Sequence, residues 1–99
     1  MEISISSRAQ TNIENIAEFS LKFSTNYANT VITEIYSKID SIQDDPYIGR
    51  YVPELSDKHY RERICRNYRI IYLVSEKHNT IFIRYIISRK QNSKIFFEV

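Results

Sequence analysis

The chain has little of what cross-links or interrupts a protein: one cysteine, one glycine, two prolines and no tryptophan among 99 residues. Because Cys65 stands alone, an intrachain disulfide and a cysteine-based metal site are both excluded. A single unbridged thiol is typical of a reducing compartment, so we expect a cytoplasmic protein. The N-terminus lacks the basic and apolar segments of a signal peptide, and no run approaches the roughly 18 apolar residues of a membrane span. We therefore expect no membrane partner.

The remaining composition predicts one folded domain over residues 1–99. Hydrophobic residues make up 42% of the chain, which is enough for a single core at this length. The net charge of +2 is only mildly basic, whereas proteins that bind nucleic acid by electrostatics alone usually carry more. The positive residues are concentrated in the last third of the chain. This distribution indicates an anionic partner, either nucleic acid or an acidic protein segment, or else a solvated charged surface. No pattern predicts a metal or another cofactor.

The hydrophobic periodicity predicts an α+β fold of order β-α-α-β-β-β. Alternation with a period of two indicates strands, and apolar residues at helical spacing indicate helices capped by serine or threonine. The expected strands are 2–6, 60–66, 68–75 and 80–88, and the expected helices are 7–23 and 24–44. A helical hairpin should therefore pack on one face of a small, mainly antiparallel sheet. The segment 47–58 is expected to be irregular, and Gly49 is expected there in a backbone conformation that other residues resist.

A short turn at 76–79 predicts the register of the last hairpin. If Ser75 pairs with Thr80, Ile70 lies opposite Tyr85, and the side of the hairpin that carries them is almost purely apolar and suited to the helices. A three-residue loop would shift this pairing by one.

The same register places Arg69 and Arg84 on the opposite, solvent-facing side. We expect one or two arginines of the strand 60–66 to join them, because that strand carries arginine on both of its sides. Clustered guanidinium groups suit phosphates or the carboxylates of an acidic partner, although charges that protect a sheet edge are an alternative. The predicted target-binding or nucleic-acid-binding residues are Arg61, Arg63, Arg69, Arg84, Arg89 and Lys90.

Four short motifs resemble the RelE/ParE superfamily of bacterial toxins. They are Gly49-Arg50, Pro53-Glu54, the strand Tyr68-Arg69-Ile70-Ile71-Tyr72, and Ser88-Arg89-Lys90 after the last strand. The resemblance implies a toxin of a type II toxin–antitoxin module, neutralised by a cognate antitoxin whose extended segment wraps over the toxin. RelE-like members of this superfamily are ribosome-dependent mRNA endoribonucleases, and ParE-like members poison DNA gyrase.

The resemblance also suggests catalytic residues, should the chain be a metal-free endoribonuclease. Glu54 matches the acid that follows a proline in the mRNA-cutting relatives, and Arg69 matches the arginine that opens the central strand. Arg89 matches a basic residue after the last strand. Glu54 would act as base, with the two arginines stabilising a phosphorane. Alternatively, Glu54 is a structural acceptor that ties its loop to Arg50 or Arg61.

The C-terminal end departs from the mRNA-cutting pattern. Many relatives place histidine where this chain has Ser88, or tyrosine where it has Phe96 and Phe97. In this chain, the side chains of Ser88, Phe96 and Phe97 cannot transfer a proton. The departure favours a ParE-like inhibitor of gyrase over a ribonuclease, and a toxin-like fold without activity is a third interpretation. The apolar residues Ile95, Phe96 and Phe97 are a candidate antitoxin contact, or they simply pack on the helices.

Overall fold

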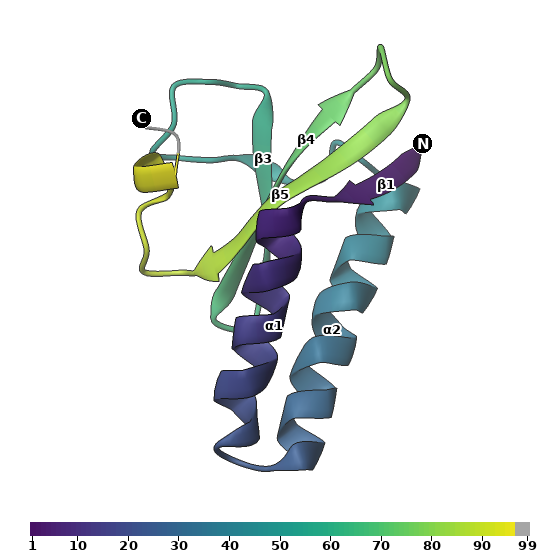
Figure 1. The fold of residues 1–99 in the computed structure, drawn as a ribbon. Helices are drawn as coiled ribbons and strands as arrows, with labels where there is room; N and C mark the ends of the chain where they lie inside the picture. Colours follow the sequence, from purple (N-terminus) through teal and green to yellow (C-terminus); the bar gives the residue numbers. More distant parts are fainter. Residues whose placement is uncertain (97–99) are drawn as a thin grey trace.

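In the computed structural model, which describes residues 1–96, two helices cover one face of a five-stranded sheet (Figure 1). The sheet has the order β1-β5-β4-β3-β2, with β1 parallel to β5 and the other neighbours antiparallel. The predicted α+β fold is confirmed. The elements are β1 (Glu2–Ile5), α1 (Ser7–Leu21), α2 (Thr25–Asp44), β2 (Arg50–Tyr51), β3 (Tyr60–Cys65), β4 (Tyr68–Ser75), β5 (Thr80–Ser88) and a 3₁₀ helix, η1 (Ser93–Phe96). The strand β2 was not predicted, because two residues carry no periodic signal.

Serine side chains begin both helices. The Ser6 hydroxyl accepts a hydrogen bond from the Ala9 amide at 3.0 Å, and the Ser24 hydroxyl accepts one from the Tyr27 amide at 3.0 Å. Each cap satisfies an amide that has no partner within the first helical turn. The caps therefore fix where α1 and α2 start.

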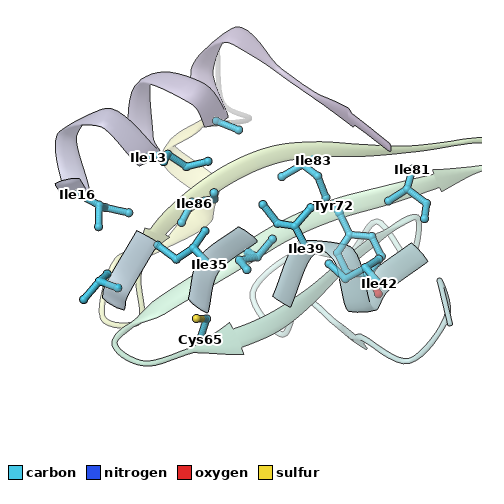
Figure 2. Packing of buried hydrophobic residues seen from close by; sticks show 13 residues of the cluster. Ile13, Ile16, Ile35, Ile39, Ile42, Cys65, Tyr72, Ile81, Ile83 and Ile86 are labelled. Carbon is cyan, nitrogen blue, oxygen red and sulfur yellow. The ribbon is translucent and has the colours of Figure 1, made fainter. Parts of the chain in front are cut away.

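The main core lies between the helices and the sheet (Figure 2). The stripe predicted for the second helix is buried, and Ile35 and Ile42 are completely inaccessible to solvent. It packs against side chains from the facing side of the sheet, among them Ile70 and Tyr72 of β4 and Ile83 of β5. The helical hairpin is thus held to the sheet by contacts between large apolar side chains.

A β-bulge changes the predicted register of the last hairpin halfway along its length. Ser75 pairs with Thr80 as expected, but the pairing shifts between Ile71 and Tyr72. Ile70 consequently lies opposite Ile86, and the expected pairing of Ile70 with Tyr85 is wrong. The shift keeps apolar side chains on the helix-covered face along both strands, because one extra residue in β5 restores the alternation.

The extra residue in β5 is Arg84. It has no partner in the register and is exposed to solvent. Its guanidinium carbon lies 5.4 Å from the centre of the Phe82 ring.

The sheet face opposite the helices is partly covered rather than open. A second, smaller cluster buries Val52, Ile71 and Ile87, with Leu55 and Tyr60 packed against it. Val52 and Leu55 come from the segment between β2 and β3, which folds over this face. This cover forms because Ile71 and Ile87 would otherwise place large apolar surfaces in water.

Gly49 is required for space and not for its backbone freedom. No glycine has a positive φ, so the expected unusual conformation is wrong; within residues 1–96, Arg66 and Asn79 are the positive-φ residues, at 55° and 48°. A Cβ atom at Gly49 would lie 2.4 Å from the hydroxyl oxygen of Tyr72. That hydroxyl accepts a hydrogen bond from the Gly49 amide at 3.0 Å and donates one to the Pro46 carbonyl at 2.9 Å.

Candidate functional site: a buried ion-pair chain and a cationic hollow

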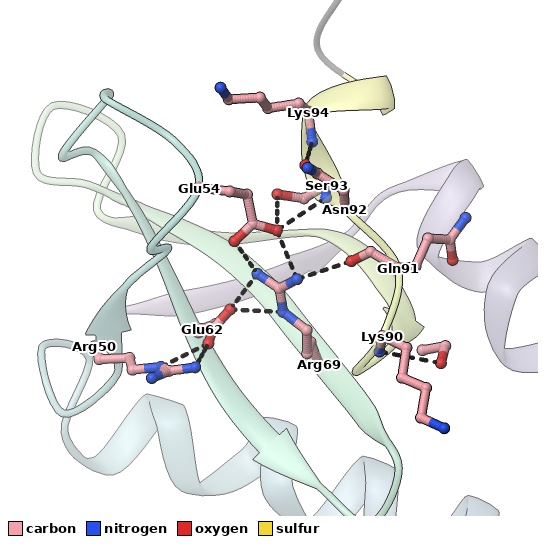
Figure 3. Close-up of polar contacts among 10 residues, drawn as sticks. Arg50, Glu54, Glu62, Arg69, Lys90, Gln91, Asn92, Ser93 and Lys94 are labelled. Carbon is pink, nitrogen blue, oxygen red and sulfur yellow. Dashed lines mark hydrogen bonds and ion pairs between the residues drawn. The ribbon is translucent and has the colours of Figure 1, made fainter.

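Four charged side chains form a chain of ion pairs on the sheet face opposite the helices (Figure 3). Arg50 of β2 donates to Glu62 of β3 at 2.7 Å, and Glu62 accepts from Arg69 of β4 at 2.8 Å. Arg69 in turn holds Glu54, from the segment after β2, with two hydrogen bonds of 2.6 Å. The sequence motifs Gly49-Arg50, Pro53-Glu54 and Tyr68-Arg69 therefore meet at one place.

The strand register brings the two central members together. Glu62 lies opposite Ile71 in the antiparallel pair, so its side chain projects from the same face as those of Ile71 and Arg69. The Glu62 side chain is fully buried and that of Arg69 is 7% exposed. Charges this deeply buried are tolerated only when paired and hydrogen-bonded. Glu62 was missed as a site residue, although its face follows from the register.

Every nitrogen of the Arg69 guanidinium contacts an acceptor within the protein. Nε donates to Glu62, and Nη2 lies 2.7 Å from the same oxygen of Glu62. Nη1 and Nη2 each donate to one oxygen of Glu54, and Nη1 also donates to the Gln91 carbonyl at 2.9 Å. Four of its five N–H donors thus make hydrogen bonds, and Nη2 lies beside Glu62 as an ion pair. A phosphate could bind Arg69 only by displacing these partners.

Glu54 is equally engaged. Beside Arg69, one of its oxygens accepts hydrogen bonds from the amide and the hydroxyl of Ser93, both at 2.9 Å. The hydrogen bonds from Arg69 and, to a smaller extent, those from Ser93 together lower the pKa of Glu54 from 4.5 to about 2, against the opposing effect of burial. At neutral pH this carboxylate is a poor proton acceptor. It is instead the structural acceptor of the alternative interpretation, although its partners are Arg69 and Ser93 and not Arg50 or Arg61.

Ser93 and Gln91 connect the ion-pair chain to the segment that follows β5. Glu54 and Arg69 thereby fasten this segment to β4 and to the segment after β2. No sequence pattern indicated Ser93 as a site residue, because the C-terminal segment is typical of neither a helix nor a strand. The predicted antitoxin contact falls on the same end of the chain: Phe97 lies outside the described residues, and so do the side chains of Ile95 and Phe96.

The arginines of β3 do not join Arg69, and the expectation of a shared exposed cluster is wrong. Arg61 pairs with Tyr72 and Arg63 with Ile70, which places both on the helix-side face of the sheet. The alternation of β3 places arginine on both of its sides, so the sequence alone did not show which side faces the helices. Glu62 is buried on the face opposite the helices, and Arg61 and Arg63 therefore lie on the helix-side face.

The Arg61 guanidinium is committed to an aromatic contact. It lies 5.3 Å from the ring centre of Tyr47 and 4.5 Å from that of Tyr51. It also donates to the carbonyls of Tyr47 and Gly49, at 3.2 and 2.8 Å. Arg61 therefore holds the segment before β2 against the edge of the sheet.

Arg89 and Lys90 line a hollow of about 600 Å³, together with Asn67 and Ser88. The Arg89 amide donates to the Asn67 carbonyl at 2.8 Å, so the end of β5 is tied to the β3–β4 turn. Both cationic side chains are exposed, and among residues 1–96 neither forms an ion pair. Among the residues predicted from the sequence to bind a target or nucleic acid, Arg84, Arg89 and Lys90 are exposed to solvent.

Neither histidine lies in the ion-pair chain or lines the hollow. His59 contacts Asp57 at 2.7 Å, and His78 contacts the Ser75 hydroxyl at 2.8 Å; both are exposed in connecting segments. In the part of the chain that the structure describes, no group of three histidine, cysteine or acidic residues could hold a metal ion. None of the helices described combines the length and apolar character needed to cross a membrane.

The fold is that of the RelE/ParE toxins. A chromosomal ParDE toxin–antitoxin structure from P. aeruginosa superposes with a TM-score of 0.74 at 15% identity, covering 89% of this chain and 95% of that one. The isolated E. coli RelE toxin gives 0.67 at 13% identity, covering 97% and 92%. A YoeB/ParE toxin from Agrobacterium tumefaciens gives 0.64 at 15% identity, covering 90% and 99%.

The sequence decides the family within this fold. Residues 3–93 match the model of the family described as "ParE toxin of type II toxin-antitoxin system, parDE". The chain belongs to the ParE toxin family. No curated protein sequence matches it.

Proposed function

We propose that this chain is a ParE-like toxin that inhibits DNA gyrase by binding, without cutting RNA, and that a cognate antitoxin neutralises it. The observation that carries the proposal is the state of Glu54 and Arg69. These residues match the acid and the strand arginine of mRNA-cutting relatives, yet here they bond to each other and to the C-terminal segment. Their role is to hold the fold around the site.

A metal-free ribonuclease needs a base for the 2′-hydroxyl, a cation for the phosphorane and an acid for the leaving oxygen. Glu54, with a pKa of about 2, is a weak base, and the guanidinium of Arg69 is already paired with Glu54 and Glu62. Arg89 remains exposed and could bind a phosphate, but Ser88 beside it cannot serve as the acid. A surface that binds an anion without proton transfer fits an inhibitor better than a nuclease.

The proposed target contacts are the exposed cationic residues in β5 and directly after it. Arg89 and Lys90 border the hollow, and Arg84 projects from the bulge of the same strand. Arginine and lysine in such positions attract an anionic partner at long range and can bind its phosphates or carboxylates. Arg61 and Arg63 are weaker candidates, because they lie on the helix-side face of the sheet.

Two reconstituted assays test the proposal side by side. Purified toxin is added to DNA gyrase with supercoiled plasmid, and separately to ribosomes programmed with a defined mRNA. We expect gyrase-dependent DNA cleavage or loss of supercoiling, with the mRNA intact. Phased mRNA cleavage that disappears in Glu54→Gln would establish the ribonuclease instead. If gyrase is unaffected at stoichiometric excess and the mRNA also survives, the interpretation as an inactive toxin-like fold is favoured.

A further inference from the structure

Basic residues in and around β5 are not offset by acidic ones. Between Glu76 and Glu98 the sequence contains no aspartate and no glutamate. The basic residues of this interval are Lys77, Arg84, Arg89, Lys90 and Lys94. These five exceed the net charge of +2, so the rest of the chain is net negative. A segment with one sign of charge attracts an anionic partner at long range, even in a protein whose total charge is small.

Arg8 adds a further cation to this segment from the start of α1. β1 pairs with β5 as far as Ile83, and the chain then enters α1 beside the bulge (Figure 1). There the Ser6 hydroxyl donates to the Arg84 carbonyl at 2.8 Å. The guanidinium carbon of Arg8 lies 5.5 Å from the centre of the Tyr85 ring. Arg8 therefore lies next to β5, although it is remote from that strand in the sequence.

Two aromatic rings hold Arg8 and Arg84 over the sheet face opposite the helices. Tyr85, below Arg8, packs against the second apolar cluster of that face. Phe82, below Arg84, lies between two residues of β5 that point into the main core, so its own side chain points the other way. A cation–π contact orients a guanidinium without neutralising it. Both arginines therefore keep their full charge at the surface.

Arg8, Arg84, Arg89 and Lys90, here called the β5 track, have the spacing of a phosphate backbone. All four are exposed, and among residues 1–96 none of them forms an ion pair. A strand rises about 3.3 Å per residue, so about 16 Å separates Arg84 from Arg89. One strand of DNA carries a phosphate about every 3.4 Å along the helix axis, which gives about five over that length. The charges of the β5 track and of DNA are thus complementary in sign and similar in density.

The β5 track lacks the apolar surface that a protein partner would need. Among residues 1–94, the exposed large hydrophobic side chains lie within 19–27 and 47–51, and none is in β5. Ile86 and Ile87 of this strand are buried. The centre of a protein–protein interface is more apolar than the surrounding surface, whereas interfaces with DNA are more polar and more positively charged. The surface composition therefore favours DNA over an acidic protein segment.

We propose that the β5 track binds the phosphate backbone of double-stranded DNA without reading its sequence. Arg8 and Arg84 contact successive phosphates, and the hollow lined by Arg89 and Lys90 receives another. This inference rests on the proposed function, because the DNA concerned is the duplex held by gyrase. It adds Arg8 to the target contacts and assigns these contacts to the DNA of the gyrase complex.

The test measures binding of the purified toxin to a fluorescein-labelled DNA duplex by anisotropy, at several salt concentrations from about 20 to 200 mM. The double variant Arg8→Gln with Arg84→Gln is compared with Lys22→Gln with Lys38→Gln, which removes the same charge from the helical hairpin. The slope of log Kd against log salt should fall by about 2 for the first variant, because each phosphate contact contributes about 0.9. Its Kd at low salt should rise by about 10-fold or more, and that of the control by less than about threefold.

Thermal unfolding checks that both variants are folded. Arg8 and Arg84 are exposed, so the Tm of their double variant should match that of the wild type. Arg89→Gln with Lys90→Gln provides an independent second variant and should reduce the slope by a similar amount. If the track variants and the hairpin control weaken DNA binding equally, total charge and not the β5 track is responsible, and the proposal is wrong. Tighter binding of polyglutamate than of the duplex would assign the track to an acidic protein and would also overturn it.

A gyrase supercoiling assay with the same proteins separates this inference from the proposed function. We expect the wild type and the hairpin control to inhibit gyrase and the Arg8–Arg84 double variant to inhibit it less. If the wild type inhibits gyrase but does not bind the duplex at about 20 mM salt, the DNA contact is wrong and the proposed function stands. If the wild type binds DNA through the β5 track but leaves gyrase unaffected, the proposed function fails and the DNA site stands.

Discussion

Protonation of Glu54 provides a quantitative test of the ion-pair chain. Its pKa is depressed from 4.5 to about 2 in the folded protein, mainly by Arg69. A depressed carboxyl pKa contributes stability that is fully present above the unfolded pKa and is lost as the pH falls through the folded value. A shift of this size corresponds to about 3 kcal/mol at 1.36 kcal/mol per pH unit, and partial exposure reduces the expectation to about 2–3 kcal/mol. The loss should occur between about pH 5 and pH 2.

The assay is urea unfolding of the wild type and of Glu54→Gln at several pH values across that window. At pH 7 the variant should be less stable by about 2–3 kcal/mol, because Arg69 keeps Glu62 but loses its second carboxylate. As the pH falls, the difference should shrink, since the wild type loses the same charge. Glu18→Gln, an exposed acid on α1, serves as the matched control and should follow the wild type. Parallel curves for wild type and Glu54→Gln over the whole window would refute the reasoning.

Three further predictions concern the surroundings of the site. Gly49→Ala should lower the free energy of unfolding by about 1–3 kcal/mol, because the added Cβ atom would meet the Tyr72 hydroxyl. The loss should be smaller in a Tyr72→Phe background, as measured by a double-mutant cycle in urea. Ser93→Ala should lower the free energy of unfolding by about 1 kcal/mol and speed amide hydrogen exchange in residues 89–94. Unchanged exchange would contradict the role of Glu54 in fastening that segment. Arg89→Ala should weaken growth inhibition with unchanged Tm, whereas Lys77→Ala in the β4–β5 turn should leave both unchanged, and equal toxicity of the two variants would exclude Arg89 as a target contact.

The helices and the long strands were predictable because each has one face in the core. Ile35, Ile39 and Ile42 recur at helical spacing, and the apolar run 70–74 is typical of a strand that is buried on both faces, as Ile70 and Ile71 are. The bulge was not predictable from the sequence pattern. The inserted residue in β5 leaves the sequence pattern regular on both sides of it, and the register shift becomes visible only when β5 is paired with β4.

The site was predictable as a set of motifs but not as a network. The motif positions of Glu54 and Arg69 were identified, and their direct contact depends on how the segment after β2 folds back over the sheet. Glu62 looks like an ordinary polar strand residue until β3 and β4 are paired. Ser93 lies in a segment without periodicity, and its hydrogen bonds to Glu54 arise from tertiary structure alone.

The parallel pairing of β1 with β5 has a consequence during synthesis. Among the strands that the structure describes, β5, which starts at Thr80, is the sole sheet neighbour of Glu2–Ile5, so β1 leaves the ribosome well before its partner is made. At about 5–20 residues per second, roughly two to eight seconds separate the end of α2 from that strand. Over this interval the helical hairpin lacks β5, so the part of the core that Ile81, Ile83 and Ile86 complete stays uncovered. The fold is therefore incomplete until β5 is made, and chains arrested before Thr80 should be readily degraded by protease.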